Sequence, residues 1–259
     1  MKKTVLSNDQ TQISYEVSGN GETALLFVHG WLGNKRWWDS QRDFFSDKYL
    51  IVQMDLAGHG DSGRMRTKWT AENYAKDIVA VADDLSVKDI ILVGHSMSGV
   101  YATEAAVKIP NVKALILVDT LKDLDQMITL EQAGQLFDLY RKDFKATVEN
   151  VLPQYLFAKD TPPEVKTQLQ NEFLTNSPDF AIKCIEPLYQ TDARDFAKKL
   201  NIPVRAINSD VGVTNKQINR KYFADFNYSV IEGVGHYPML EKPEEFNIAL
   251  ENYLRELIN

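Results

Sequence analysis

Short apolar runs of strand length alternate along this chain with stretches in which apolar residues recur at helical spacing. An alternating run at 12–17, preceded across a turn by the short run 4–6, indicates two paired, half-exposed strands near the start of the chain. Helical spacing follows at 37–47 and 71–85. The aliphatic runs typical of buried strands lie at 24–28, 50–54, 90–93, 114–118, 204–207 and 228–231. Strands that alternate with helices predict an α/β fold with a mostly parallel eight-stranded sheet and helices on both faces.

The rhythm of strands and helices breaks between Thr120 and about Leu200. Helical spacing without a convincing strand pattern fills this segment, at 130–143, 145–157, 163–175 and 179–188. We therefore predict a core formed by residues 1–120 and 200–259, and a helical cap inserted as residues 121–199. A cap that follows a strand lies on the rim at the carboxyl ends of the strands, where such sheets bind ligands. Its aromatic residues either shape a pocket there or form the cap's own core.

A tight turn joins the buried strand 90–93 to the next helical stretch, and its sequence is Gly94-His95-Ser96-Met97-Ser98-Gly99. Such a strand-to-helix turn exposes the central hydroxyl at the top of the sheet, beside the N-terminus of a helix that favours negative charge. Ser96 is therefore a candidate nucleophile. The alternative is an ordinary glycine-assisted turn, and Ser98 departs from the Gly-x-Ser-x-Gly pattern, which has glycine at that position.

A serine nucleophile needs a general base, and the chain has four histidines. His95 is adjacent to Ser96 and points to the opposite face, while His29 and His59 lie in glycine-containing turns that they are expected to shape. His236 follows the last strand and precedes the last helix, where a loop can reach Ser96. By elimination, His236 is the predicted base.

The base needs a carboxylate to orient it, and two aspartates follow strands at the same rim. Asp210 follows the strand 204–207 and is preferred, while Asp119 follows the strand 114–118 and is the alternative. An oxyanion hole needs backbone N–H donors. The predicted donors are Met97, at the head of the nucleophile helix, and Trp31, whose preceding glycine lets the backbone approach closely.

Composition narrows the possible partners and compartments. The chain has 259 residues, of which 44% are hydrophobic, and a net charge of −7, which argues against nucleic acid or an anionic membrane as a partner. No apolar run reaches the length of about 18 residues that spans a membrane, and the N-terminus lacks the apolar core of a signal peptide. We expect a cytoplasmic protein. Cys184 is the single cysteine, so an intrachain disulfide is excluded. No metal cluster, phosphate-binding loop or dinucleotide fingerprint is present, so no cofactor is implied.

Four motifs in order make the chain similar to α/β-hydrolase-fold serine hydrolases over essentially its whole length. HGW at 29–31 resembles the oxyanion loop, DLAGHGDS at 55–62 the loop after the next strand, and GHSMSG at 94–99 the nucleophile elbow. GHYPMLEKPEEF at 235–246 resembles the loop of the catalytic histidine and the last helix. The resemblance implies Ser96 as nucleophile, His236 as base and a cap between the sixth and seventh strands.

The resemblance leaves the acid open. Most such hydrolases have an aspartate about where Gly212 falls here, which points to Asp210 if the loop is shorter. Others place the acid after the sixth strand, which points to Asp119. A serine at position 96 disfavours the members that use an aspartate nucleophile, the dehalogenases and epoxide hydrolases.

The expected function is therefore cofactor-independent hydrolysis of a small, largely apolar carboxylic ester through an acyl-serine intermediate. Amide, lactone, thioester or carbon–carbon bond hydrolysis would use the same residues. The alternative is a small-molecule sensor on the same fold, with slow or single turnover and a protein partner.

Overall fold

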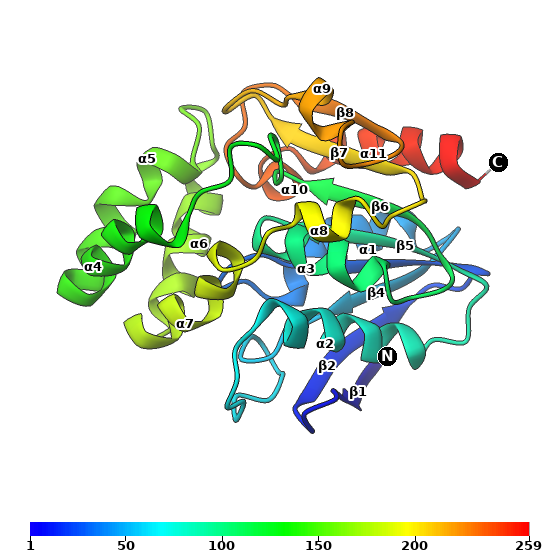
Figure 1. Ribbon diagram of the computed structural model, residues 1–259, viewed down its shortest axis with the longest axis horizontal. Helices are drawn as coiled ribbons and strands as arrows, with labels where there is room; N and C mark the ends of the chain where they lie inside the picture. The colour runs from blue at the N-terminus through cyan, green and yellow to red at the C-terminus, as the bar shows by residue number, and fades with distance from the viewer. Residues whose placement is uncertain (259) are drawn as a thin grey trace.

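An eight-stranded sheet forms the centre of the computed structural model, which describes residues 1–258 (Figure 1). Its strands lie in the order β1-β2-β4-β3-β5-β6-β7-β8. They are β1 (Lys2–Leu6), β2 (Gln12–Ser18), β3 (Thr23–Val28), β4 (Leu50–Met54), β5 (Asp89–His95), β6 (Val112–Val118), β7 (Val204–Ser209) and β8 (Phe226–Ile231). β2 is antiparallel to β1 and β4, and the other pairings within residues 1–258 are parallel. The predicted mostly parallel sheet of eight strands is confirmed.

Helices cover the sheet on both faces. The helix α2 packs against α3, which covers β5 and β6, whereas α1 packs against α11, which covers β7 and β8. Figure 1 shows α2 and α3 on the near side of the sheet and α11 behind it. These elements and the short helices are η1 (Lys35–Trp38), α1 (Asp39–Phe45), α2 (Ala71–Asp83), α3 (Met97–Ala106), α8 (Arg194–Ala197), α9 (Lys216–Asn219), α10 (Pro238–Glu241) and α11 (Pro243–Ile258).

Local capping decides where the first two helices begin. The side chain of Asn34 accepts a hydrogen bond from the backbone N–H of Arg36 at 3.0 Å, so the predicted helix 37–47 starts earlier, as a 3₁₀ turn, and continues as α1. Thr70 caps α2 in the same way through the N–H of Asn73. The buried side chains of α2 recur at helical spacing, and this face packs on the core.

Five helices precede α8 in the segment between β6 and β7, where the sequence pattern contains no strand. They are α4 (Leu130–Ala146), the π-helix η2 (Thr147–Val151), α5 (Pro153–Leu156), α6 (Pro163–Leu174) and α7 (Pro178–Tyr189). Figure 1 shows α4 to α7 gathered at the end of the sheet toward which the arrows of β6 and β7 point. The single helix expected at 145–157 is wrong: it is divided into a π-helix and a short α-helix, and Pro153, which has no N–H to donate, begins the latter. The boundaries of the core and the cap stay a prediction.

Candidate active site

Ser96 occupies a strained turn between β5 and α3. Its backbone angles are φ 55° and ψ −123°, a conformation that costs a residue with a side chain about 1–3 kcal/mol. Gly94 makes the turn possible, because a Cβ at this position would lie 2.7 Å from the carbonyl oxygen of Ser98 and 2.9 Å from Cβ of Ala102. The helix therefore crosses close over the end of its own strand, as the predicted nucleophile turn requires.

Ser98, the departure from the glycine pattern, has a structural role of its own. Its side chain is fully buried, and its hydroxyl donates a hydrogen bond to the carbonyl oxygen of His29. The first turn of α3 is thereby attached to the loop that follows β3. A serine is accepted here because it bonds to the neighbouring loop.

A continuous hydrogen-bonded chain connects Ser96, His236 and Asp119. The distance from Oγ of Ser96 to Nε2 of His236 is 2.7 Å, and that from Nδ1 of His236 to Oδ2 of Asp119 is also 2.7 Å. Because a carboxylate accepts hydrogen bonds, Nδ1 of His236 carries the proton and leaves Nε2 free to accept from the serine hydroxyl. The His236 side chain is 22% exposed and that of Asp119 5%. The arrangement has the geometry of a Ser-His-Asp site.

The aspartate that contacts His236 is Asp119, the alternative, and not Asp210, the preferred candidate. On this point the preference for Asp210 is wrong. Asp210 is exposed, and its Oδ2 accepts a hydrogen bond from the N–H of Gly233 at 3.1 Å. The reason is the length of β7, which runs to Ser209 and not to the end of the aliphatic run at 207. The N–H of Asp119 bonds to the carbonyl of Ile207, so Asp210 lies beyond the level of the site.

Two contacts fix the loop that carries His236. The N–H of His236 donates to the carbonyl of Leu156 in α5 at 2.7 Å, and its carbonyl accepts from Nε2 of His95 at 2.7 Å. A Cβ at Gly235 would lie 2.3 Å from the carbonyl oxygen of Leu156. His95 therefore acts on the backbone of the histidine loop, which agrees with the expectation that it does not serve as the base of Ser96.

The loop after β3 lies against Ser96. A Cβ at Gly30 would be 2.6 Å from Nδ1 of His95 and 3.1 Å from Cβ of Ser96, so only glycine allows this approach. The backbone amide of Trp31 follows Gly30 directly. The indole N–H of the Trp31 side chain donates to the carbonyl of Ala181 in α7 at 2.7 Å. Met97 is the first residue of α3, and its N–H has no acceptor within the helix. The two predicted oxyanion donors thus belong to the two segments that flank Ser96.

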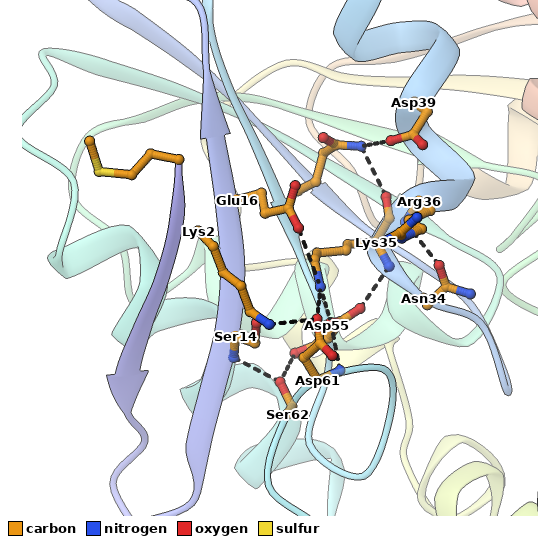
Figure 2. Close-up of polar contacts among 12 residues, drawn as sticks. Lys2, Ser14, Glu16, Asn34, Lys35, Arg36, Asp39, Asp55, Asp61 and Ser62 are labelled. Atoms are coloured by element: carbon orange, nitrogen blue, oxygen red, sulfur yellow. Dashed lines mark hydrogen bonds and ion pairs between the residues drawn. The ribbon is translucent and has the colours of Figure 1, made fainter.

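A buried charged cluster holds the end of that loop in place. Figure 2 shows Lys35 surrounded by Glu16, Asp55 and Asp61. The ammonium group lies 2.7 Å from Oδ2 of Asp55 and 2.7 Å from Oδ2 of Asp61, and the backbone N–H of Lys35 donates to Oδ1 of Asp55 at 2.7 Å. η1 is thereby joined to the glycine-rich loop after β4. Removal of one partner from such a buried pair leaves an uncompensated charge.

A family model and two relatives match most of this chain. The model described as "Alpha/beta hydrolase family" matches residues 25–249. The chain belongs to this family. This alpha/beta hydrolase is 22% identical over 262 residues to 3-oxoadipate enol-lactonase 2 of Acinetobacter baylyi, and the alignment covers 98% of this chain and 97% of that protein. It is 24% identical over 245 residues to the karrikin insensitive 2 receptor CA of Petunia hybrida, covering 88% and 90%.

Solved structures agree on the fold of this hydrolase. The esterase from Exiguobacterium antarcticum superposes with a TM-score of 0.87 at 23% identity, over 98% of this chain and 100% of that one. The enol-lactonase from Burkholderia xenovorans gives a TM-score of 0.83 at 19% identity, over 98% and 100%. The relatives support hydrolase activity and include receptors, and they leave the bond and the substrate open.

A cavity of about 490 Å³ opens at Ser96 and His236. Its wall combines the core residue Trp31 with side chains of α4, η2, α5 and α7. Ile128, Leu139 and Tyr155 also line the cavity and are 58%, 40% and 71% exposed, so the cavity opens to solvent beside α4 and α5. No Asp, Glu, Lys or Arg of the described chain lines it. The cavity favours an uncharged, largely apolar ligand.

Burial and charge set the ionisation of the site in different ways. Burial alone raises the pKa of Asp119, but the hydrogen bonds and charges of His236 and Lys122 outweigh it and hold this pKa well below its ordinary value. Burial lowers the pKa of His29 to about 4 and the pKa of His95 to about 3. Asp119 is therefore ionised and these two histidines are neutral near pH 7.

Sequence reasoning missed Lys122, whose ammonium group lies 2.8 Å from Oδ1 of Asp119. The only signal was a lysine three residues after a candidate acid, and such a spacing is common.

Among residues 1–258, no group of three or more His, Cys, Asp and Glu side chains is arranged to hold a metal ion. The helices of that range also include none with the length and apolar character needed to cross a bilayer.

Proposed function

We propose that this alpha/beta hydrolase cleaves small, uncharged, largely apolar carboxylic esters through an acyl-serine intermediate. The observation that carries the proposal is the hydrogen-bonded chain of Ser96, His236 and Asp119 at the floor of an apolar cavity. No side chain in this chain of contacts requires a cofactor to act. The esterase and lactonase relatives support the same class of reaction.

In this mechanism, Oγ of Ser96 attacks the ester carbonyl carbon while Nε2 of His236 accepts the hydroxyl proton. Asp119 holds the imidazole in the correct tautomer and stabilises the imidazolium. The N–H groups of Trp31 and Met97 donate to the oxygen that becomes negative. The tetrahedral intermediate collapses, His236 gives the proton to the leaving alkoxide oxygen, and the alcohol departs. Water then attacks the acyl-serine with His236 again as base, and the second tetrahedral intermediate collapses as His236 returns the proton to Oγ of Ser96 and the carboxylic acid leaves.

Charge discrimination tests the substrate class. p-Nitrophenyl butyrate and the 4-nitrophenyl monoester of succinic acid are similar in size, but the second carries a carboxylate. We expect kcat/KM to be at least about 100-fold lower for the succinate ester, because its charge would be buried without a partner. Initial rates of p-nitrophenol release measure this ratio. Equal values for the two esters would show that the acyl chain does not enter the apolar cavity.

Gly30→Ala tests the oxyanion loop. The added methyl forces the loop away from His95 and Ser96 and displaces the Trp31 amide, so we expect kcat to fall about 100-fold with little change in KM. Gly134→Ala in α4 is the matched control, because a Cβ there meets no atom within 4 Å, and its kcat should stay within about twofold. A Gly30→Ala enzyme as active as the control contradicts the role of this loop.

A second candidate function is a small-molecule sensor, and the receptor relative in Petunia favours it. A sensor would form the acyl-serine with one equivalent of ligand and release it slowly. Pre-steady-state kinetics separate the two functions: after any initial burst, an esterase continues to release product linearly over many turnovers, whereas a sensor nearly stops after one equivalent. We propose the esterase as the function, and cytoplasmic localisation stays a prediction.

A further inference from the structure

A lysine lies against the oxygen of Asp119 that does not face His236. Nζ of Lys122 is 2.8 Å from Oδ1 of Asp119, whereas Oδ2 of Asp119 contacts His236. The Lys122 side chain is 18% exposed and that of Asp119 5%, so solvent screens this pair only in part. The same Oδ1 also accepts the backbone N–H of Ser209 at 2.7 Å. The carboxylate thus has a cation on one oxygen and the histidine on the other.

The backbone brings Lys122 to this position. Asp119 and Leu121 have φ values of 46° and 48°, in the left-handed region that residues with side chains rarely adopt. Two such residues within three positions turn the chain back, so the lysine side chain returns to the carboxylate that precedes it. The Lys122 carbonyl accepts the N–H of Asn215 at 2.8 Å, which anchors the turn to the segment after β7.

The ammonium group also holds the end of β7 in place. Nζ of Lys122 donates to Oγ of Ser209 at 2.9 Å and to the carbonyl of Val211 at 2.5 Å. Lys122 therefore connects the acid, which follows β6, to the chain that follows β7. This link joins the two strand ends that both supplied candidate acids in the sequence.

We propose that Lys122 is a positioning residue of the hydrolytic site, which fixes Asp119 and partly neutralises its charge so that the enzyme stays active at lower pH. The inference rests on the proposed function. The carboxylate stabilises the imidazolium form of His236, and a cation on the same carboxylate opposes that effect. Lys122 is therefore expected to extend the activity of the enzyme further toward acid pH. The same cation also weakens the stabilisation that Asp119 gives to the imidazolium formed during the reaction.

The expected shift of the acid limb is attributed to the Asp119–Lys122 pair, and not to the neighbouring His95 or Tyr237. Burial holds the pKa of His95 at about 3 and raises that of Tyr237 well above its ordinary value, so both stay neutral between pH 5 and pH 9. The ionisable groups that border the histidine or its loop are His95 from β5, Asp119 and Lys122 after β6, Asp210 after β7, Tyr237 and Glu241 at α10, and Tyr140, Tyr155 and Tyr189 in the cavity wall.

The test is the pH profile of kcat/KM for p-nitrophenyl butyrate in the wild type and in Lys122→Met. We expect the acid limb to move up by about one pH unit, which makes the variant about tenfold slower than the wild type on that limb. The alkaline plateau should stay within about threefold. Lys122→Arg should restore the wild-type limb. Lys221→Met removes a lysine that pairs with Asp125, and it should leave the limb unchanged.

A uniform loss at all pH values, with the limb in place, would overturn the proposal and make Lys122 a structural residue only. An unshifted limb with full activity would also overturn it. A second measurement is independent of turnover: the NMR titration of the His236 ring, assigned among the four histidines by substitution, should show the same shift in Lys122→Met. If the wild type shows no Ser96-dependent hydrolysis, the proposed function fails, and this titration still decides whether Lys122 acts on the Asp119–His236 pair.

Discussion

Replacing Ser96 by alanine is expected to lower kcat by about 10⁴- to 10⁶-fold on p-nitrophenyl butyrate, because it removes the hydroxyl that bonds to the predicted base His236. The residual rate would come from substrate binding and from the N–H donors of Trp31 and Met97. The variant should stay folded and melt within a few degrees of the wild type, since alanine loses only the hydrogen bond to His236 and keeps the same strained backbone. Initial rates and a thermal melt measure both effects.

Ser98→Ala is the control for this experiment, because it removes a hydroxyl two residues away on the same helix turn. It loses the bond to the His29 carbonyl, so we expect a destabilisation of about 1 kcal/mol and a rate within about tenfold of the wild type. Retained turnover in Ser96→Ala, on an ester that the wild type cleaves well, would remove Ser96 from the mechanism.

Asp119→Asn is expected to lower kcat by about 10³- to 10⁴-fold, because the amide favours the wrong tautomer of His236 and cannot stabilise the imidazolium. Asp210→Asn is its matched control. Asp210 follows the neighbouring strand and is exposed, with its carboxylate on the N–H of Gly233, so its kcat should stay within about threefold. Steady-state kinetics of the two variants, side by side, decide between the two acids.

The opposite pattern, a large loss in Asp210→Asn and a small one in Asp119→Asn, would mean that the histidine loop takes another position during the reaction. Equal and small losses would mean that no acid assists His236. Thermal melts of both variants separate these outcomes from unfolding, which is a concern for Asp119 because its carboxylate is buried and accepts three groups.

Sequence reasoning succeeded where local order along the chain decides the outcome. Eight apolar runs predicted the strands, and the turn at Gly94 predicted that Ser96 lies at the end of β5, where it lines the cavity. Elimination among the four histidines led to His236, whose ring the structure places against Ser96. In each case a strand end positions the side chain, and strand ends are visible in the sequence.

Sequence reasoning failed where the outcome depends on the position of one strand end relative to another. The polar residues Asn208 and Ser209 extend β7 beyond its aliphatic run, and this extension carries Asp210 past the level of the site. Lys122 reaches Asp119 only because Asp119 and Leu121 adopt left-handed backbone angles, although neither is glycine. No pattern of residue types predicts such a turn.

The most direct test of the acyl-serine mechanism is peptide mass spectrometry of the protein after acid quench during turnover of p-nitrophenyl butyrate, with a fluorophosphonate-treated sample alongside. We expect a butyryl adduct and a phosphonyl adduct on the peptide that contains Ser96, and neither adduct at this peptide in Ser96→Ala. Hydrolysis without any adduct at Ser96, or an adduct on another residue that is lost together with activity when that residue is replaced, would contradict the account.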